Sequence, residues 1–210
     1  MSFLLPRVYP LTDVSLTGLS HAEQVNRLCA GGAALVQLRE KVMAVRDFFA
    51  EAQAALINAR AGGVKLIIND RVDLALAIGA DGVHLGQDDL PPASARTLLG
   101  PRAIIGFSTH NRWQATSALA LPIDYIAVGP IFPSQTKGDT ALHLGLSGLR
   151  GVRQAIGSFP LVAIGGITEL NASDVIAAGA DSVALISSLL AEPVEITART
   201  ARLLETLKHF

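Results

Sequence analysis

Short apolar runs recur along the chain, and seven of them end abruptly in polar, charged or glycine residues. Eight runs are rich in Val, Ile and Leu, a pattern typical of parallel strands buried on both faces. We expect strands at residues 8–11, 34–38, 66–68, 82–85, 103–107, 125–128, 161–164 and 182–186. Segments with helical periodicity lie between them, at residues 20–30, 45–61, 72–78, 93–99, 112–120, 147–156, 170–178 and 194–207. Strand and helix therefore alternate throughout.

This alternation predicts an α/β fold, a single (β/α)8 TIM barrel formed by one domain over residues 1–210. Similar glycine-containing segments recur just before strands, which indicates one repeated βα unit. A doubly wound open sheet is the alternative, but such sheets usually have fewer strands. In a barrel the loops that follow the strands gather at one rim, so the polar strand ends are expected to form one site there.

The amino-acid composition indicates which kinds of molecule the protein binds. Half of the residues are hydrophobic, 17% are charged, and the formal net charge is −1 without runs of Lys or Arg. Nucleic acids and anionic membranes require clustered positive charge, so we expect small-molecule partners, no nucleic acid and no membrane. The one cysteine excludes a disulfide within the chain, and no apolar run approaches the ~18 residues of a membrane span. We expect a cytoplasmic protein, and the sequence leaves open whether copies associate into a homo-oligomer.

The candidate chemistry lies in seven polar clusters that follow the predicted strands. They are Gln37-Leu-Arg-Glu-Lys41, Asn69-Asp70, Gln87-Asp88-Asp89, Ser108-Thr109-His110, Ser134-Gln-Thr-Lys137, Gly165-Gly166 and Ser187-Ser188. The glycine pair and the serine pair follow the seventh and eighth predicted strands, where such barrels commonly bind a phosphate. A tight turn that needs glycine is the alternative for the first pair.

Charged residues in the earlier clusters indicate an anion and a divalent cation. Arg39 and Lys41 are alternate residues at the end of one strand, and Lys137 is expected to complete a cationic cradle with them. Glu40, between the first two, is interpreted as a solvated surface charge. Asp70 and Asp89 end neighbouring strands, so their carboxylates are expected to share Mg²⁺ with phosphate oxygens and water.

Several of these residues have alternative interpretations. Asp70 at its position also fits a helix N-cap, and Asp88 beside Asp89 is interpreted as a bystander. His110 fits either an acid/base role or a helix start, whereas His84, inside a predicted strand, is interpreted as a hydrogen-bonded core histidine.

The amides and the serine hydroxyl complete the candidate site. Gln37 and Asn69 carry amides that donate and accept at once, which suits recognition of a heterocycle's edge. Ser108 is expected to bond a diphosphate oxygen or a leaving group.

The ordered set of motifs resembles the thiamine-phosphate synthase family from the second predicted strand to the eighth. The motifs are Gln37-Leu-Arg-Glu-Lys41, Ile67-Ile-Asn-Asp-Arg71, Gly82-Val-His-Leu-Gly-Gln-Asp-Asp89, Gly106-Phe-Ser-Thr-His110, Gly129-Pro-Ile-Phe-Pro-Ser-Gln-Thr-Lys137, Ala163-Ile-Gly-Gly-Ile167 and Gly179-Ala-Asp-Ser-Val183. The resemblance implies a Mg²⁺-dependent transferase of thiamine biosynthesis. Such an enzyme condenses 4-amino-2-methyl-5-hydroxymethylpyrimidine diphosphate with 4-methyl-5-hydroxyethylthiazole phosphate, giving thiamine phosphate and diphosphate through a dissociative, carbocation mechanism.

The resemblance also implies a role for each candidate residue. The pyrimidine diphosphate would contact Gln37, Arg39, Lys41, Asn69, Ser108 and Lys137, of which Ser108 and Lys137 would be catalytic. The thiazole phosphate would contact Ser134, Thr136, Gly166, Ile186 and Ser187, and Asp70 and Asp89 would bind the metal. The segment 138–145 departs from the family pattern because it lacks the expected prolines.

Two other functions fit part of the pattern. The sister family of thiazole tautomerases, which resemble this chain in fold, would use His110 to move a proton and would need no diphosphate. A non-catalytic sensor of thiamine precursors would need no complete pair of metal-binding carboxylates. The chain keeps Lys41, Asp70 and Asp89 together, which favours the synthase.

Overall fold

Eight parallel strands form one sheet that curves into a barrel. The computed structural model describes residues 4–133 and 143–210. The strands are β1 (Val8–Pro10), β2 (Leu35–Leu38), β3 (Lys65–Asn69), β4 (Gly82–Leu85), β5 (Ile104–Thr109), β6 (Tyr125–Val128), β7 (Leu161–Ile164) and β8 (Ser182–Leu185). Each strand pairs with the next in sequence from β2 to β8, and β8 pairs with β1. A parallel bridge between Leu11 and Gln37, with Thr12 N–H donating to Gln37 O over 2.9 Å, links the two ends of the sheet.

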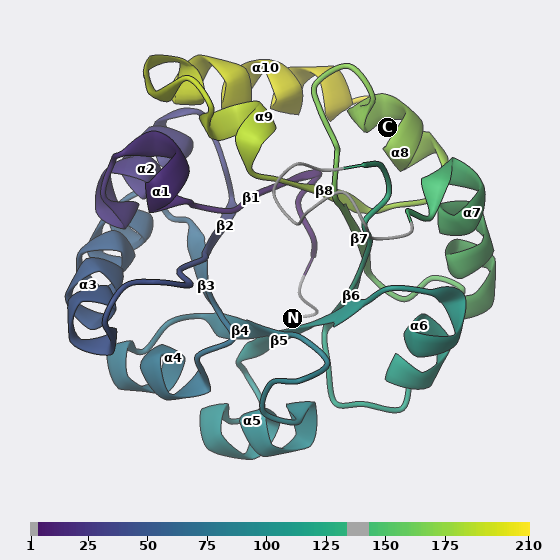
Figure 1. Cartoon of the computed structure of the whole chain (residues 1–210), viewed down its shortest axis with the longest axis horizontal. Helices are drawn as coiled ribbons and strands as arrows, with labels where there is room; N and C mark the ends of the chain where they lie inside the picture. The colour runs from purple at the N-terminus through teal and green to yellow at the C-terminus, as the bar shows by residue number, and fades with distance from the viewer. Residues whose placement is uncertain (1–3, 134–142) are drawn as a thin grey trace.

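Helices surround the barrel as an outer ring (Figure 1). They are α1 (Val14–Thr17), α2 (His21–Ala30), α3 (Val45–Ala61), α4 (Val72–Ile78), α5 (Pro92–Leu99), α6 (Arg112–Ala118), α7 (Gly145–Ile156), α8 (Ala172–Ala177), α9 (Ser187–Leu190), the 3-10 turn η2 (Pro193–Glu195) and α10 (Ile196–Leu207). The longest, α3, shows why these segments are helical. Its buried residues follow the helical spacing of i, i+4, i+7, i+8 and i+11 and so lie on one face: Phe48, Ala52, Ala55, Leu56 and Ala59.

The apolar residues form two layers. The larger one fills the space between strands and helices, and the smaller one fills the barrel itself. Inside the barrel, Leu35, Ile67, Val162 and Ala184 point inward from four different strands, while Leu5 packs against this inner layer. The interior of the barrel is thus a packed core.

The structure confirms the predicted TIM barrel and its eight strands, with differences at the ends of helices. Helix α7 begins two residues before the predicted start at 147, and α8 begins two residues after the predicted 170. The predicted helix at 194–207 starts only at Ile196, because Pro193–Glu195 forms the 3-10 turn. The sequence analysis did not predict α1 and α9, each of four residues, because so short a helix shows no periodicity.

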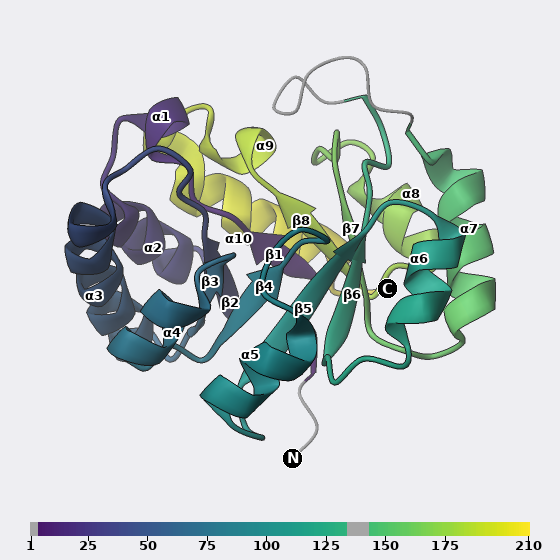
Figure 2. The ribbon, with the colours of Figure 1, turned by 60° about the horizontal axis from the view of Figure 1, so that its bottom comes forward.

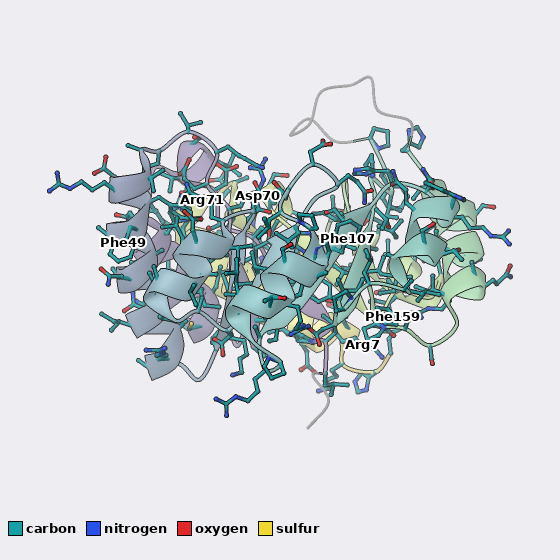
Figure 3. All side chains as sticks on the ribbon, turned by 90° about the horizontal axis from the view of Figure 1, so that it is seen from below. Arg7, Phe49, Asp70, Arg71, Phe107 and Phe159 are labelled. Atoms are coloured by element: carbon teal, nitrogen blue, oxygen red, sulfur yellow. The ribbon has the colours of Figure 1, made fainter. Side chains whose placement is uncertain are left out.

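The carboxyl ends of the strands all face one side of the molecule (Figure 2). Asp70, which follows β3, lies at this upper edge in Figure 3, whereas Arg7, which precedes β1, lies at the opposite edge. We call the upper edge the C-terminal rim. Within residues 4–133 and 143–210, no helix is long and apolar enough to cross a membrane.

Candidate active site

A cavity of about 510 Å³ opens at the C-terminal rim. Residues from all eight strands or the loops directly after them line it, as expected when parallel strand ends converge. The candidate residues in its wall are Gln37, Arg39, Asn69, Ser108, His110, Gly166, Ile186 and Ser187. Lys41, Asp70 and Asp89 do not line this cavity and lie in the loops beside it. Ser134, Thr136 and Lys137 lie outside the residues that the structure describes.

Two amides on the cavity wall have a buried polar atom without a partner among the described residues. Gln37 at the end of β2 is 2% exposed, and its Oε1 has no hydrogen bond. Asn69 at the end of β3 is 8% exposed, and its Nδ2 has none. Leaving a buried donor or acceptor unpaired costs about 1–3 kcal/mol each, so an acceptor and a donor on neighbouring strands indicate a polar ligand with the complementary pair.

Two carboxylates and a lysine lie together at the rim. Lys41 Nζ is 2.5 Å from Asp70 Oδ2, and Asp89 Oδ2 accepts from Gly86 N–H at 2.6 Å. Burial raises the pKa of Asp89, and the negative charge of Asp70 raises it further, against the opposing effect of the Gly86 N–H. A carboxylate pair that repels in this way gains from a cation. No group of three or more His, Cys, Asp or Glu side chains converges within the described part of the chain, so any cation here would take its other ligands from substrate and water.

Asp70 does not cap a helix. The N-cap residue of α4 is Arg71, without a side-chain cap bond, and Asp70 has a positive φ of 62°. Its backbone N–H donates to His84 O over 2.8 Å. A left-handed conformation is uncommon for a residue other than glycine and often marks functional sites. The alternative interpretation of Asp70 as a cap is therefore wrong.

The interpretation of Glu40 as a solvated charge is also wrong. Its side chain is only 10% exposed, and Oε1 accepts the backbone N–H groups of Lys41, Val42 and Met43 at 2.7, 2.7 and 3.0 Å. Oε2 lies 3.4 Å from Nε2 of the buried His21. Burial alone would raise the pKa of Glu40, but these backbone donors and His21 outweigh it and lower the pKa. Glu40 thus anchors the loop that carries Lys41.

Arg39 is oriented by residues that the sequence analysis did not select. Its guanidinium lies 3.6 Å from Asp13 Oδ2, and its backbone N–H donates to Thr12 Oγ1 over 3.3 Å. Asp13 also caps α1, the short helix absent from the predicted elements. An Asp directly before a short segment with apolar residues fits a helix N-cap, and this signal could have indicated Asp13.

The two glycines after β7 are required by the backbone. Gly165 has a φ of 100° and Gly166 a φ of 64°. A Cβ at Gly165 would lie 2.6 Å from Pro130 Cβ, and one at Gly166 would lie 2.5 Å from Pro133 O. The tight-turn interpretation thus holds for this pair. Because Gly166 lines the cavity as well, the turn also places backbone polar groups at the rim.

Two histidines of the cavity wall, His84 and His110, differ in their surroundings. His110 is exposed, and its Nδ1 lies 2.9 Å from Gly129 O. It does not start a helix, because Asn111 caps α6. His84 is 7% exposed and hydrogen-bonded at both ring nitrogens, as predicted for a core histidine, but it also lines the cavity and contacts Ser108 Oγ at 2.8 Å.

Comparison of the sequence with those of known proteins identifies a family that the chain resembles. The family described as thiamine monophosphate synthase matches residues 8–189. The thiamine-phosphate synthase of Chloroflexus aurantiacus is 48% identical over 200 residues, covering 94% of this chain and 92% of that protein. That of Methanoculleus marisnigri is 43% identical over 197 residues, covering 93% of each.

Solved structures give the same result. A thiamine phosphate pyrophosphorylase from Pyrococcus furiosus superposes with a TM-score of 0.87 at 32% identity, covering 97% of this chain and 96% of that one. A thiamine phosphate pyrophosphorylase from Bacteroides thetaiotaomicron reaches a TM-score of 0.71 at 15% identity, which supports the shared fold alone. By the extent of the family match and the identity to full-length relatives, the chain belongs to the thiamine monophosphate synthase family.

Proposed function

We propose that this chain condenses 4-amino-2-methyl-5-hydroxymethylpyrimidine diphosphate with 4-methyl-5-hydroxyethylthiazole phosphate. In this reaction the bond between the pyrimidine methylene carbon and the diphosphate oxygen breaks, and its electrons leave with diphosphate. The thiazole nitrogen then forms the new bond to carbon, which gives thiamine phosphate. The enzyme is a transferase, as its named relatives are.

The unpaired amide atoms of Gln37 and Asn69 carry the proposal. An aminopyrimidine presents a ring nitrogen that accepts a hydrogen bond beside an exocyclic amino group that donates one. Asn69 Nδ2 supplies the donor and Gln37 Oε1 the acceptor, and both atoms are buried without partners among the described residues. Binding of this heterocycle would satisfy both atoms at once and so remove their desolvation cost.

The rim charges fit the diphosphate and Mg²⁺. Asp70 and Asp89 would hold the cation, since two carboxylates with water and phosphate oxygens suit its octahedral preference. Bound Mg²⁺ would neutralise charge that develops on the leaving group. Arg39, steadied by Asp13, would bind phosphate oxygens, and Lys41 would turn from Asp70 toward them. Their positive charge disperses the negative charge of the leaving diphosphate without a protein nucleophile.

The other side of the cavity would hold the thiazole phosphate. Gly166, Ile186 and Ser187 line that wall, and Ser134 and Thr136 would join them from the neighbouring segment. Ser108 would donate a hydrogen bond to the leaving diphosphate, and Lys137 would add positive charge there. The path would be dissociative, because donors and cations would surround the leaving oxygen and the pyrimidine ring would stabilise the cation left behind.

We further propose, from the sequence pattern, that residues 1–210 act as a single domain in the cytoplasm with small molecules as their partners.

The test is incubation of the purified chain with both substrates and Mg²⁺ while thiamine phosphate is followed by fluorescence after oxidation. We expect product that depends on both substrates and on the metal. Absence of product with verified substrates, together with thiazole tautomerisation that His110→Ala abolishes, would instead assign the sister activity. Binding of thiamine phosphate without either reaction would assign a sensor.

A further inference from the structure

Five polar side chains form a continuous row of hydrogen bonds across the inside of the barrel. This row, the hydrogen-bond chain, runs from Gln37 through Tyr9, Tyr125 and His84 to Ser108. Gln37 Nε2 lies 3.0 Å from Tyr9 Oη, which lies 2.9 Å from Tyr125 Oη. Tyr125 Oη lies 2.9 Å from His84 Nδ1, and His84 Nε2 lies 2.8 Å from Ser108 Oγ. It connects the amide that faces the pyrimidine subsite with the hydroxyl that faces the diphosphate.

The donor at one end is consistent with a single direction along the chain. The Nε2 group of Gln37 can only donate, so Tyr9 accepts there, and its own hydrogen is available for Tyr125. Burial raises the pKa of Tyr9 and of Tyr125, so both keep their hydroxyl hydrogens. Tyr125 therefore donates to His84 Nδ1, and a neutral imidazole then carries its hydrogen on Nε2. His84 donates this hydrogen to Ser108 Oγ, which frees the Ser108 hydrogen for the cavity.

We infer that His84 is a positioning residue that holds the Ser108 hydroxyl as a hydrogen-bond donor toward the departing diphosphate. This inference rests on the proposed function. In the opposite arrangement Ser108 would donate to His84 and would present lone pairs to an anion, which is unfavourable. A donor fixed before the reaction stabilises the charge that develops without having to reorient.

A glycine in β5 makes room for this arrangement. A Cβ at Gly106 would lie 2.0 Å from Tyr125 Cζ and 2.5 Å from His84 Nδ1. Glycine inside a strand normally weakens it, so its presence often marks a close approach by another group. Here the approaching groups are the side chains of Tyr125 and His84, which contact each other beside Gly106.

The substrate would reinforce the same direction. An amino group that donates to Gln37 Oε1 keeps the Gln37 amide in the orientation seen here, with Nε2 toward Tyr9. Recognition of the aminopyrimidine and orientation of Ser108 are thus linked through buried hydrogen bonds.

Two substitutions that introduce amide side chains test the two hydrogen bonds of His84 separately, the one with Tyr125 and the one with Ser108. His84→Gln places an amide near the position of Nε2 and retains a donor for Ser108. His84→Asn places its amide near Nδ1, so it keeps a partner for Tyr125 but loses the contact with Ser108. Thermal melting of each variant shows whether the barrel is intact.

Steady-state kinetics with both substrates and Mg²⁺ then tests whether His84 acts on the reaction through Ser108. We expect His84→Asn to lower kcat about 100- to 1,000-fold, as removal of one preorganised donor does, with little change in KM. His84→Gln should recover most of this loss. Ser108→Ala should lower kcat by a similar factor, and the double variant His84→Asn/Ser108→Ala should match it within about twofold. Losses that multiply, or a change in KM alone, would overturn the inference.

A ¹⁵N NMR spectrum of the wild-type protein tests the direction of the chain independently of activity. We expect His84 to be protonated at Nε2 and bare at Nδ1, and Tyr125→Phe to weaken this preference. Protonation at Nδ1 in the wild-type protein would overturn the inference even if the variants failed to fold. A wild-type protein without synthase activity would overturn the proposed function, and the spectrum would still decide the orientation of Ser108.

Discussion

Glu40 gives the sharpest prediction about how the loop bearing Lys41 is held. Its carboxylate accepts three consecutive backbone N–H groups and lies beside the buried His21, so Glu40→Ala removes all of these contacts together. We expect both a loss of stability and a higher KM for the pyrimidine diphosphate. The second effect follows because Lys41 would no longer be held near Asp70.

The magnitude follows from the bonds that are lost. Hydrogen bonds to a charged group each contribute about 1.5–3 kcal/mol. Lys41 and Val42 are exposed, so water would replace part of this loss, and we expect a destabilisation of about 2–3 kcal/mol for Glu40→Ala. Glu40→Gln keeps an acceptor oxygen without the charge and should cost about 1 kcal/mol.

Urea unfolding followed by circular dichroism measures these differences. Glu23→Ala is the matched control, because that carboxylate makes an exposed pair with Arg27 at 2.5 Å, worth about 0.3–0.5 kcal/mol. If Glu40→Ala destabilised the protein no more than Glu23→Ala does, the anchoring role of Glu40 would be refuted.

The pH dependence of the same difference has a definite sign. The pKa of Glu40 is lower in the folded protein than in the unfolded chain. Its stabilising effect is therefore complete above the unfolded pKa of about 4.3 and is lost as the pH falls through the lower folded value. The stability gap between wild type and Glu40→Gln should thus be full near neutral pH and should close in acid.

Three further predictions concern the rim. Asp89→Ala should raise the Mg²⁺ concentration needed for half-maximal rate at least about tenfold, whereas Asp88→Ala, which changes an exposed neighbour, should leave that concentration unchanged. If both variants needed the same Mg²⁺ concentration as the wild type, Asp89 would not belong to the metal site. Gly166→Ala should destabilise the fold by about 1–2 kcal/mol because residue 166 has a left-handed backbone, and the clash with Pro133 O should add to this destabilisation. The variant should also have a higher KM for the thiazole phosphate, and a wild-type melting temperature and KM would contradict this. Gln37→Leu should raise KM for the pyrimidine diphosphate about tenfold or more, because it removes the acceptor for the amino group, and an unchanged KM would place that group elsewhere.

Most of the fold was predictable because the strands are mostly apolar and the glycines between units are regular. The missed helices α1 and α9 have four residues each, too few for a hydrophobic period. Residues 194–195 of the 3-10 turn at Pro193–Glu195 were predicted as helix, since a proline at the first turn is compatible with either.

The site was predictable only where polar residues end strands. Gln37, Asn69 and Ser108 stand out because they interrupt apolar sequence, and the structure brings all three to one cavity. Tyr9 and Tyr125 gave no signal, because a tyrosine in a buried strand has the pattern of a core residue whatever its hydroxyl contacts.

Glu40 was misinterpreted for a related reason. Its partners are backbone N–H groups of the following residues, which exist in any sequence. The residue types in the sequence therefore do not show that the loop turns these N–H groups toward a carboxylate.

The most direct test of the central claim is a ³¹P NMR time course of the purified chain with both phosphorylated substrates and Mg²⁺. We predict that thiamine phosphate and inorganic diphosphate appear in equal amounts as the pyrimidine diphosphate disappears. Release of diphosphate without a matching amount of thiamine phosphate, or no consumption of the pyrimidine diphosphate, would contradict the account.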